Sequence, residues 1–403
     1  MIPKCILPWV YLEIEQNGDV HPCCQNDYIF GKLKESPLEQ IWNGDKMKEF
    51  RLSLLKDQLP DSCFGCKNAE ELQSNSIRKI YNEVFKNSFS EAIENTNEDG
   101  SLKNIKFKGY HFRISNKCNF KCRMCNKESS SAFTGEVIEY SKELNFDEFV
   151  ENNLDNLELI EFSGGETLIM DEHYQLLQKL IDKGKTDVHI EYSTNMSTLK
   201  YKSYNVLDYW SKWNPQKLFV AASIDEIGQR AEYIRKGTKW SSVEKNLKLI
   251  SQQPFTSQIT MVISCLNVFR LPEIIQYLTD IGYIDPKKFL DELYKYSMVQ
   301  FYFVDPASDE SPLSLWILPE KFKHKTKEKL NYFIQNYNTR YNTDISPIFN
   351  PVISYLNKKT NREIVEKFLY KNIEMDKDRG ENLFKTIPEF VEILEEWKKF
   401  VLV

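Results

Sequence analysis

The sequence predicts an α/β protein in which a parallel, barrel-like sheet is wrapped by helices and preceded by a small cysteine-rich region. From residue 106 onward, short apolar runs alternate with amphipathic stretches, a pattern that favours strands joined by helical crossovers. Five of the nine cysteines lie within the first 66 residues, and after residue 310 the patterns are mostly helical. We therefore expect four regions along the chain: 1–75, 76–105, 106–310 and 311–403.

Six apolar runs are candidate strands of the parallel sheet, and they lie at 110–115, 157–162, 188–193, 218–223, 260–264 and 298–303. Amphipathic stretches between them predict helices, for example at 173–182, 242–251 and 272–281. Active sites of barrels built this way gather at the carboxyl ends of the strands. Polar residues that directly follow these strands are therefore the first candidates for a site.

The regions that flank the barrel have their own signals. Asn17-Gly18 is a strong hairpin turn signal between short apolar segments. A helix from Ala69 to Phe85 is expected to link the cysteine-rich region to the barrel. In the carboxyl-terminal region Pro319 is expected to open a helix, whereas the polar, Asn-rich segment 336–346 predicts a loop.

Composition excludes several classes of function. The 53 basic and 59 acidic residues give a formal net charge of −6, so no basic field indicates nucleic acid. No apolar run approaches the roughly 20 residues that span a bilayer. The first residues lack a signal-peptide pattern, and we expect a cytoplasmic protein. In a reducing compartment nine cysteines favour metal ligation over disulfides, and their two groups suggest two metal centres.

Cys118, Cys122 and Cys125 form a Cys-x3-Cys-x2-Cys triplet packed into eight residues, just after the first predicted strand. Three thiolates this close can hold one [4Fe–4S] cluster at three irons and leave the fourth iron open to a small molecule. The competing interpretation is a structural zinc site or a chance cluster. Zinc favours paired cysteines that total four ligands, and no further Cys or His follows until His173.

The triplet resembles the cluster motif of the radical S-adenosylmethionine (radical SAM) enzymes, in which the open iron chelates SAM. A second motif, Ser163-Gly164-Gly165-Glu166, follows the next predicted strand and resembles the family's motif for the methionine amino group of SAM. The family usually continues with Pro, whereas Thr167 follows here. The resemblance implies a partial (β/α)6, TIM-like barrel and assigns Gly164, Gly165 and Glu166 to SAM.

Polar side chains recur at the ends of the later strands. By resemblance to the family, the residues that would contact SAM are Thr194, Ser223, Arg235 and Asn267. Ordinary capping is the alternative for each, since Ser, Thr and Asn are favoured before helices. Cys265 is most simply a small buried residue, and a role in hydrogen-atom transfer is the alternative.

The amino-terminal cysteines have a spacing of their own: Cys5, twelve residues, Gly18, four residues, Cys23, and later Cys63-x2-Cys66. This spacing resembles the SPASM and Twitch auxiliary-cluster domains, and the resemblance implies a second [4Fe–4S] cluster on Cys5, Cys23, Cys63 and Cys66. Cys24 is the alternative ligand to Cys23, and a four-cysteine zinc knuckle is the competing interpretation. In better-known members the auxiliary domain follows the barrel, whereas here it precedes it.

The resemblance implies an enzyme that cleaves SAM reductively to methionine and a 5′-deoxyadenosyl radical, which removes hydrogen from a substrate. The auxiliary cluster would relay an electron from the substrate radical or hold the substrate in place, and a complete set of four thiolates favours the relay. The implied partners are a one-electron reductant, such as flavodoxin or ferredoxin, and a peptide or protein substrate. The alternatives are a small sugar or nucleotide metabolite as substrate, or a non-catalytic iron–sulfur or zinc platform.

Overall fold

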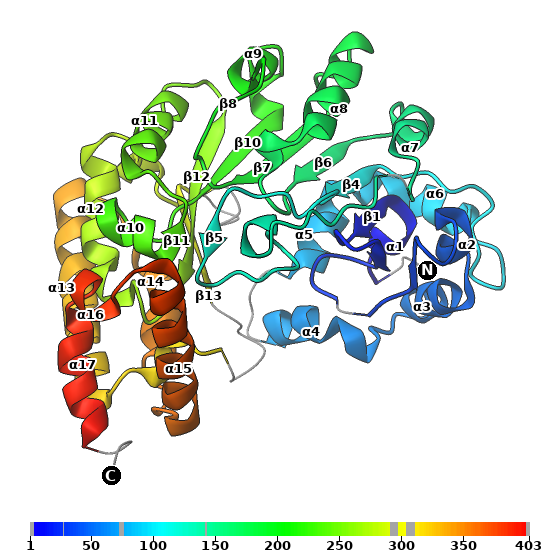
Figure 1. Cartoon of the computed structure of the whole chain (residues 1–403). Helices are drawn as coiled ribbons and strands as arrows, with labels where there is room; N and C mark the ends of the chain where they lie inside the picture. Colours follow the sequence, from blue (N-terminus) through cyan, green and yellow to red (C-terminus); the bar gives the residue numbers. More distant parts are fainter. Residues whose placement is uncertain are drawn as a thin grey trace. The chain divides into compact units, whose positions relative to one another are not determined.

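The computed structural model describes residues 4–26, 28–71, 76–141, 143–290, 297–303 and 311–399. The chain divides into two compact units. Unit 1 consists of Met1–Asn119, Asn126–Ser193 and Lys200–Leu218, and unit 2 consists of Phe120–Cys125, Thr194–Leu199 and Phe219–Val403. Figure 1 gives the labels of the helices and strands. The four regions expected along the chain stay a prediction.

The sheet of unit 1 has the strand order β7-β6-β4-β1-β2-β3. Its strands are β1 (Tyr11–Ile14), β2 (Asp19–His21), β3 (Gly31–Lys32), β4 (Gly109–Phe112), β6 (Leu159–Phe162) and β7 (His189–Thr194). Strands β1, β4, β6 and β7 are mutually parallel, so the amino-terminal hairpin extends the barrel sheet through β1. The sequence analysis did not anticipate this pairing.

The two faces of these parallel strands differ in chemistry, because successive side chains point to opposite faces. One register row consists of the buried residues Leu12, Tyr110, Ile160 and Ile190. This face packs against α7 (Phe146–Asn153), α8 (Asp171–Asp182) and α9 (Val206–Trp210), with ring contacts such as Tyr110 to Phe149 and Tyr192 to Trp210. We call the opposite face the inward face.

The amino-terminal part of unit 1 confirms the predicted hairpin: Gly18 has φ +88° and β1 pairs antiparallel with β2. Its helices are α1 (Leu7–Val10), α2 (Leu38–Trp42), α3 (Asp45–Leu55), α4 (Phe64–Glu71), α5 (Ile77–Val84) and α6 (Phe89–Glu94). The single helix predicted from Ala69 to Phe85 is wrong, because Ser76 caps a new helix by accepting a hydrogen bond from the Lys79 amide. Residues 72–75 of the predicted helix lie outside the described residues.

Unit 2 continues the alternation of strands and helices. Its parallel strands are β10 (Leu218–Ser223), β12 (Thr256–Ile263) and β13 (Val299–Phe303), with helices α10 (Gly228–Ile234), α11 (Trp240–Ile250) and α12 (Leu271–Asp280). The short strands β5 (Lys121–Cys122) and β11 (Arg235–Lys236) pair antiparallel. Strands β8 (Lys200–Tyr201) and β9 (Tyr204–Asn205) form a small ribbon in unit 1. All six predicted barrel strands are present, and the predicted α/β class with a partial barrel is confirmed.

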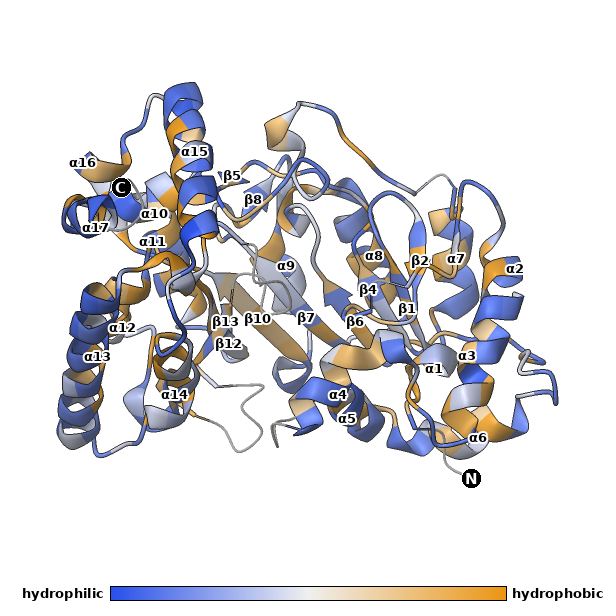
Figure 2. Ribbon diagram, turned by 90° about the horizontal axis from the view of Figure 1, so that it is seen from below, coloured by the Kyte–Doolittle hydropathy of each residue, from blue (hydrophilic) through white to orange (hydrophobic). Residues whose placement is uncertain are grey.

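The carboxyl-terminal region is helical, as predicted. Its helices are α13 (Glu320–Tyr341), α14 (Ser346–Tyr355), α15 (Arg362–Arg379), α16 (Leu383–Thr386) and α17 (Glu389–Lys398). Hydrophilic and hydrophobic residues alternate along α15 in Figure 2, as expected of a helix with one buried face. The loop predicted at 336–346 is mostly wrong: α13 continues to Tyr341, because Tyr337 and Tyr341 hydrogen-bond Thr279 and Gln276 of α12.

His173 generates a prediction about pH. This fully buried side chain on α8 contacts the Tyr192 hydroxyl at 2.9 Å, and burial lowers the pKa of His173 to about 3. The unfolded chain then binds a proton near pH 6.5 that the folded chain binds only near pH 3. Stability should therefore be complete above pH 6.5 and fall on acidification, by at most about 1.4 kcal/mol per pH unit.

His173→Gln should flatten this acid slope, measured as the shift of the urea unfolding midpoint between pH 7 and pH 5. His324→Gln is the matched control, because His324 is exposed on α13. Equal slopes for His173→Gln and the unaltered protein would contradict the assignment.

Candidate functional site

The Gly-Gly-Glu motif packs directly against the residue that precedes Cys118. Gly165 has φ +39°, and a Cβ there would lie 2.2 Å from the Lys117 carbonyl oxygen. The Glu166 amide donates a hydrogen bond to the same carbonyl at 2.8 Å. Only glycine permits this approach, since any side chain at 165 would overlap the backbone of Lys117. The motif and the start of the cysteine triplet are thus held together within unit 1.

The remaining residues of the motif lie close by. The Glu166 carboxylate is buried and accepts a hydrogen bond from the Leu168 amide at 3.2 Å, so it also caps a short 3-10 turn. A Cβ at Gly164 would lie 2.9 Å from Gln16 Nε2 and 3.1 Å from Arg113 Cβ. Gln16 is buried, and its amide nitrogen has no hydrogen-bond partner among the described residues. This donor was not predicted from the sequence.

Each part of the cysteine triplet has its own surroundings. In unit 1 the Cys118 amide donates a hydrogen bond to Ser131 Oγ at 3.2 Å. In unit 2 Cys122 is buried on β5, and the Cys125 amide donates to the Cys122 carbonyl. Arg235 Nη1 lies 4.0 Å from Cys122 Sγ, while Arg235 Nε donates to Asp225 at 2.6 Å. A guanidinium beside the sulfur suits a thiolate ligand.

Two of the residues predicted to contact SAM line one cavity of unit 2, together with Phe120 of the cysteine triplet segment. They are Ser223 and Arg235, and Asn195 lines the same cavity. Thr194, the residue before Asn195, is buried and accepts a hydrogen bond from the Met196 amide. A role of Thr194, Ser223 and Arg235 in SAM binding stays a prediction, and the shared cavity supports it for Ser223 and Arg235.

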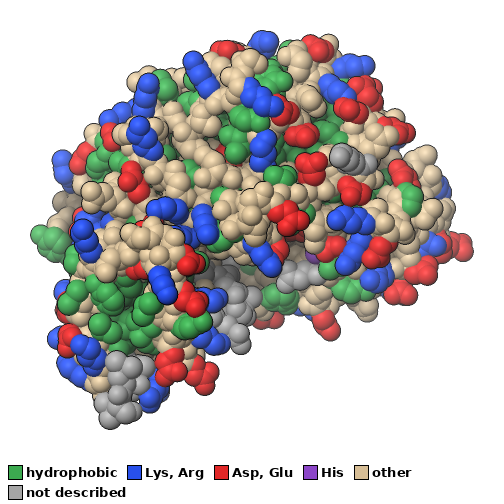
Figure 3. All heavy atoms as spheres, viewed as in Figure 1, with side chains coloured by type: hydrophobic (Ala, Val, Ile, Leu, Met, Phe, Trp, Pro, Cys, Tyr) green, Lys and Arg blue, Asp and Glu red, His purple; other side chains and the backbone are tan. Residues whose placement is uncertain are grey.

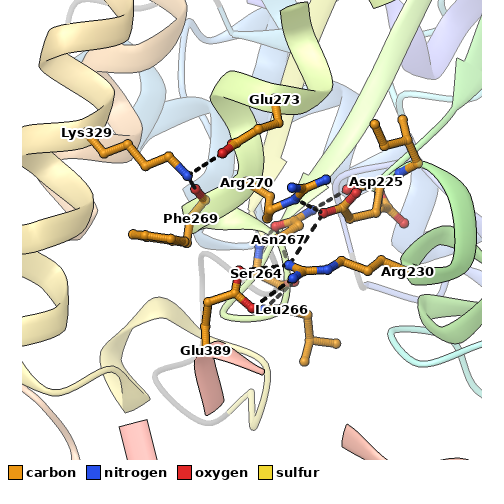
Figure 4. A network of polar contacts seen from close by, with 12 residues as sticks. Asp225, Arg230, Ser264, Leu266, Asn267, Phe269, Arg270, Glu273, Lys329 and Glu389 are labelled. Atoms are coloured by element: carbon orange, nitrogen blue, oxygen red, sulfur yellow. Dashed lines mark hydrogen bonds and ion pairs between the residues drawn. The ribbon is translucent and has the colours of Figure 1, made fainter. Parts of the chain in front are cut away.

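The Asn267 side chain stabilises a loop in unit 2 through hydrogen bonds. Its amide oxygen accepts a hydrogen bond from the Ser264 amide at 2.9 Å, and its amide nitrogen donates to the carbonyls of Asp225 and Val262 (Figure 4). These contacts fit the alternative interpretation of a local structural role. Cys265 is 4% exposed, and burial raises its pKa well above the ordinary value, as for a small core residue.

The predicted auxiliary cysteines lie around one cavity of unit 1. Cys5, Cys23, Cys63 and Cys66 line it, together with apolar side chains such as Leu7 and Phe50. The Asn26 amide nitrogen lies 3.7 Å from Cys63 Sγ, an N–H to sulfur contact. Burial, and then the Cys66 thiol, raises the pKa of Cys63 to about 11. Thiolates there would need compensating positive charge, which iron supplies.

Within the described residues no three Cys, His, Asp or Glu side chains lie close enough together to enclose a single metal ion. The observation that bears on a bound cluster is therefore the cavity shared by four thiols.

Cys24 points away from this cavity. Its side chain is exposed, and its strongest electrostatic neighbours are the carboxylates of Glu13 and Glu161 on the inward face. The neighbours of Cys23 are instead Cys5, Cys66 and Cys63. Cys23 thus lines the four-thiol cavity, whereas Cys24 is not among its lining residues. The placement favours Cys23 over Cys24 as the ligand.

The inward face carries a row of ionisable side chains that the sequence analysis missed. Glu13, His111, Glu161 and Glu191 occupy the same register position on β1, β4, β6 and β7. Barrel interiors are usually filled with branched apolar side chains. The signal was present in the sequence, because each of these strands alternates apolar and polar residues, for example Tyr110-His111-Phe112-Arg113.

His111 joins two strands of this row to the Gly-Gly-Glu motif. Its Nδ1 contacts Glu13 Oε2 at 2.5 Å, and its Nε2 contacts Ser163 Oγ. Burial alone would lower the pKa of His111, but the Glu13 carboxylate outweighs burial and raises it. Burial alone would raise the pKa of Glu13, but His111 and then Arg113 outweigh burial and lower it. Glu13 and His111 thus favour the charged form of each other.

Glu161 lies next to His111 on the same face. The Tyr11 hydroxyl donates a hydrogen bond to it, and burial, then Glu161, raises the pKa of Tyr11 and of Tyr81 on α5. Glu161 forms no ion pair with Lys, Arg or His among the residues described. A half-buried carboxylate held only by tyrosine hydroxyls gives the inward face an excess of negative charge.

Comparison with known families supports the two centres. A radical SAM superfamily model matches residues 112–278, and an iron–sulfur cluster-binding SPASM domain model matches residues 5–67. The chain thus carries a segment that matches a SPASM domain followed by a segment that matches a radical SAM domain, the order expected from its cysteines, and these domains mark it as an enzyme. The radical SAM domain brings a [4Fe–4S] cluster and SAM as cofactors, and the SPASM domain brings auxiliary iron–sulfur binding.

Individual relatives are distant. The antilisterial bacteriocin subtilosin biosynthesis protein AlbA of Bacillus subtilis (strain 168) is 24% identical over 173 residues, which cover 42% of this chain and 36% of AlbA. Among solved structures, native anSMEcpe with bound AdoMet has a TM-score of 0.42 at 19% identity, covering 59% of this chain and 62% of that one.

SuiB of Streptococcus suis bound to precursor peptide SuiA has a TM-score of 0.40 at 12% identity, covering 84% of this chain and 70% of SuiB. The chain thus matches less than two thirds of the length of AlbA and of anSMEcpe.

The surface carries both signs of charge. Acidic and basic side chains are interspersed over the face shown in Figure 3. Among the helices of the described residues, none has the length and apolar character needed to cross a bilayer.

The pair of Glu13 and His111 generates the second prediction. Glu13→Gln removes the charge that holds the proton on His111, so the pKa of His111 should fall by about one unit or more. NMR titration of the histidine ring protons measures this shift. Glu15→Gln is the matched control, because Glu15 pairs with Arg113 and not with His111. An unchanged His111 pKa in Glu13→Gln would contradict the described pairing.

Proposed function

We propose that this enzyme abstracts a hydrogen atom from a peptide or protein substrate, using a cluster held by Cys118, Cys122 and Cys125 and an auxiliary cluster held by Cys5, Cys23, Cys63 and Cys66. When bound, the first cluster and SAM supply the electron and the 5′-deoxyadenosyl radical that removes hydrogen. Gly164, Gly165 and Glu166 would bind the methionine part of SAM, and Ser223 and Arg235, with Thr194 and Asn267, would complete its site.

The observation that carries this proposal is the contact between Gly165 and Lys117. The backbone of the Gly-Gly-Glu motif touches the residue before Cys118, so a ligand on that motif would lie at the start of the cysteine triplet. Two motifs about forty residues apart in sequence thus meet at the carboxyl ends of the neighbouring strands β4 and β6. This is the edge at which barrel enzymes place their chemistry.

The auxiliary site supports an electron relay. Four thiols around one cavity make a complete ligand set for a [4Fe–4S] cluster, which leaves no iron for substrate. Cys24 follows Cys23 in the chain and has Glu13 and Glu161 of the inward face as electrostatic neighbours. Once the substrate has lost a hydrogen atom, the unpaired electron of the substrate radical would pass to this cluster over a short path. A flavodoxin- or ferredoxin-type reductant in the cytoplasm would supply the first electron.

The inward face supports a polar substrate. Buried charged groups are costly unless partners satisfy them, so the row of Glu13, His111, Glu161 and Glu191 would select a ligand that donates hydrogen bonds or carries positive charge. Peptides offer backbone amides and basic side chains of this kind. AlbA, a bacteriocin biosynthesis protein, is the sequence relative that points in the same direction.

The cysteine sets provide the third prediction. Protein prepared anaerobically should hold roughly eight irons per chain, four in each cluster. Replacing Cys118, Cys122 and Cys125 with Ala should remove about half of the iron and abolish 5′-deoxyadenosine formation from SAM with dithionite. Cys5→Ala should leave 5′-deoxyadenosine formation largely intact while blocking completed product. Cys24→Ala is the matched control and should keep the iron.

Zinc as the main metal in such a preparation would contradict both clusters. A structure with three cysteines on the auxiliary cluster and an open iron would favour substrate anchoring over the relay.

The contact of Gly165 provides the fourth prediction. Gly165→Ala places a Cβ 2.2 Å from the Lys117 carbonyl and should weaken SAM binding at least about tenfold by displacing the motif. Gly184→Ala is the matched control, because Gly184 also has positive φ, +67°, but nothing lies within 4 Å of its Cβ position. Equilibrium dialysis with labelled SAM measures both variants. Equal affinities would show that backbone strain alone, and not the contact, explains any loss.

A further inference from the structure

The carboxyl-terminal helices of unit 2 hold the cysteine triplet segment through a buried arginine. Arg123 lies between Cys122 and Cys125, and its side chain is fully buried. Its Nη1 donates to Asn372 at 2.9 Å, and its Nη2 donates to Asp376 and, at 2.8 Å, to Glu381. The ring of Tyr233 stacks 3.6 Å from the guanidinium carbon. Helix α15 and the turn after it therefore contact the segment that carries two of the cysteines.

Arg379 lies on the same face of α15. Positions 372, 376 and 379 are spaced four and three residues apart, so their side chains project from one side of the helix. All three guanidinium nitrogens of Arg379 are buried, and none has a hydrogen-bond partner in the part of the chain that the structure describes. Arginine keeps its charge at physiological pH, so this is a buried cation with no partner.

The nearby carboxylates are committed to other donors. Asp376 accepts from Arg123, from the Tyr233 hydroxyl and from the Leu383 amide. Glu381 accepts from Arg123 through one oxygen and pairs with Lys236 through the other. Two carboxylates, Asp376 and Glu381, thus face three cations: Arg123, Lys236 and Arg379. One positive charge is therefore left in excess.

The electrostatic neighbours of Arg379 include one further group that would be anionic, the Cys122 thiolate. After burial and Arg123, which lower the pKa of Arg379, the groups that raise it are Glu381, Cys122 and Tyr233, and the Tyr233 hydroxyl is already bonded to Asp376. Glu381 is already paired twice, whereas Cys122 is a predicted cluster ligand. On its other side Cys122 Sγ has Arg235 Nη1 at 4.0 Å.

We propose that Arg379 is a counter-charge for the iron–sulfur cluster ligated by Cys122, and that the carboxyl-terminal helices serve to present it. This inference rests on the proposed ligation by Cys118, Cys122 and Cys125. A cluster bound by three thiolates is anionic, and the gain of one electron from the external reductant adds one further negative charge. A fixed cation nearby stabilises the reduced form more than the oxidised form, and burial strengthens the effect. Arg379 is thus a positioning residue that eases reduction of the cluster.

The test is a comparison of variants in the reconstituted full-length protein, poised anaerobically at a fixed potential with a redox dye. The EPR signal that changes on addition of SAM reports the cluster of the radical SAM domain, and its intensity gives the ratio of reduced to oxidised cluster. Arg379→Met keeps much of the side-chain length without the charge, and this ratio should fall at least about threefold. Arg379→Lys keeps the charge and should stay within about twofold. Arg340→Met, at an exposed position on α13, is the control and should match the unaltered protein.

An unchanged ratio in Arg379→Met would overturn the proposal, as would an equal fall in the Met and Lys variants, because packing and not charge would then explain the effect. Loss of the cluster in Arg379→Met with retention in Arg379→Lys would support it, and loss in both would contradict it. A SAM-insensitive signal in the unaltered protein would overturn the proposed function, and this inference with it.

Discussion

The parallel pairing of β1 with β4 places Glu13 opposite His111, and the arrangement of unit 1 depends on that register. A shift of one residue would turn Glu13 toward the helices and bring Leu12 to the inward face, since side chains alternate with a period of two. The hairpin that begins with β1 also leads to Cys23 and Cys24. The same pairing therefore fixes the ion pair on the inward face and the placement of the thiol cavity beside it.

This constraint gives the amino-terminal domain a role in the barrel itself. Its first strand supplies Tyr11 and Glu13 to the inward face, where they meet Glu161 and His111. An auxiliary domain that precedes the barrel in sequence can thus supply residues to the inward face of the sheet without a long connection. The carboxyl-terminal helices act on the other cluster segment, where Arg123 contacts residues of α15. The amino-terminal region thus carries one of the two cysteine sets, and the carboxyl-terminal helices contact the segment that carries two cysteines of the other.

Much of the fold and of the candidate site could be predicted from local patterns in the sequence. The six barrel strands, the hairpin at Asn17-Gly18 and the two cysteine groups rest on periodicity, turn chemistry and spacing, which are encoded within a few residues. The pairing of β1 with β4 could not be predicted, because it joins residues about 98 positions apart and no local signal selects a partner strand. The loop predicted at 336–346 was mostly wrong for a similar reason. Tyr337 and Tyr341 stabilise the end of α13 through contacts with α12, and these contacts override the polar composition of the segment. The position of Arg379 likewise required the folded structure.

The most direct test of the account is transfer of deuterium from substrate to 5′-deoxyadenosine. The reduced, anaerobic protein would be incubated with SAM and a peptide pool from cells grown in deuterated medium, and the 5′-deoxyadenosine analysed by mass spectrometry. The account predicts 5′-deoxyadenosine that gains one deuterium in the presence of the peptide pool and not in the presence of a deuterated sugar and nucleotide pool. Label from the small-metabolite pool alone, or no 5′-deoxyadenosine at all, would contradict it.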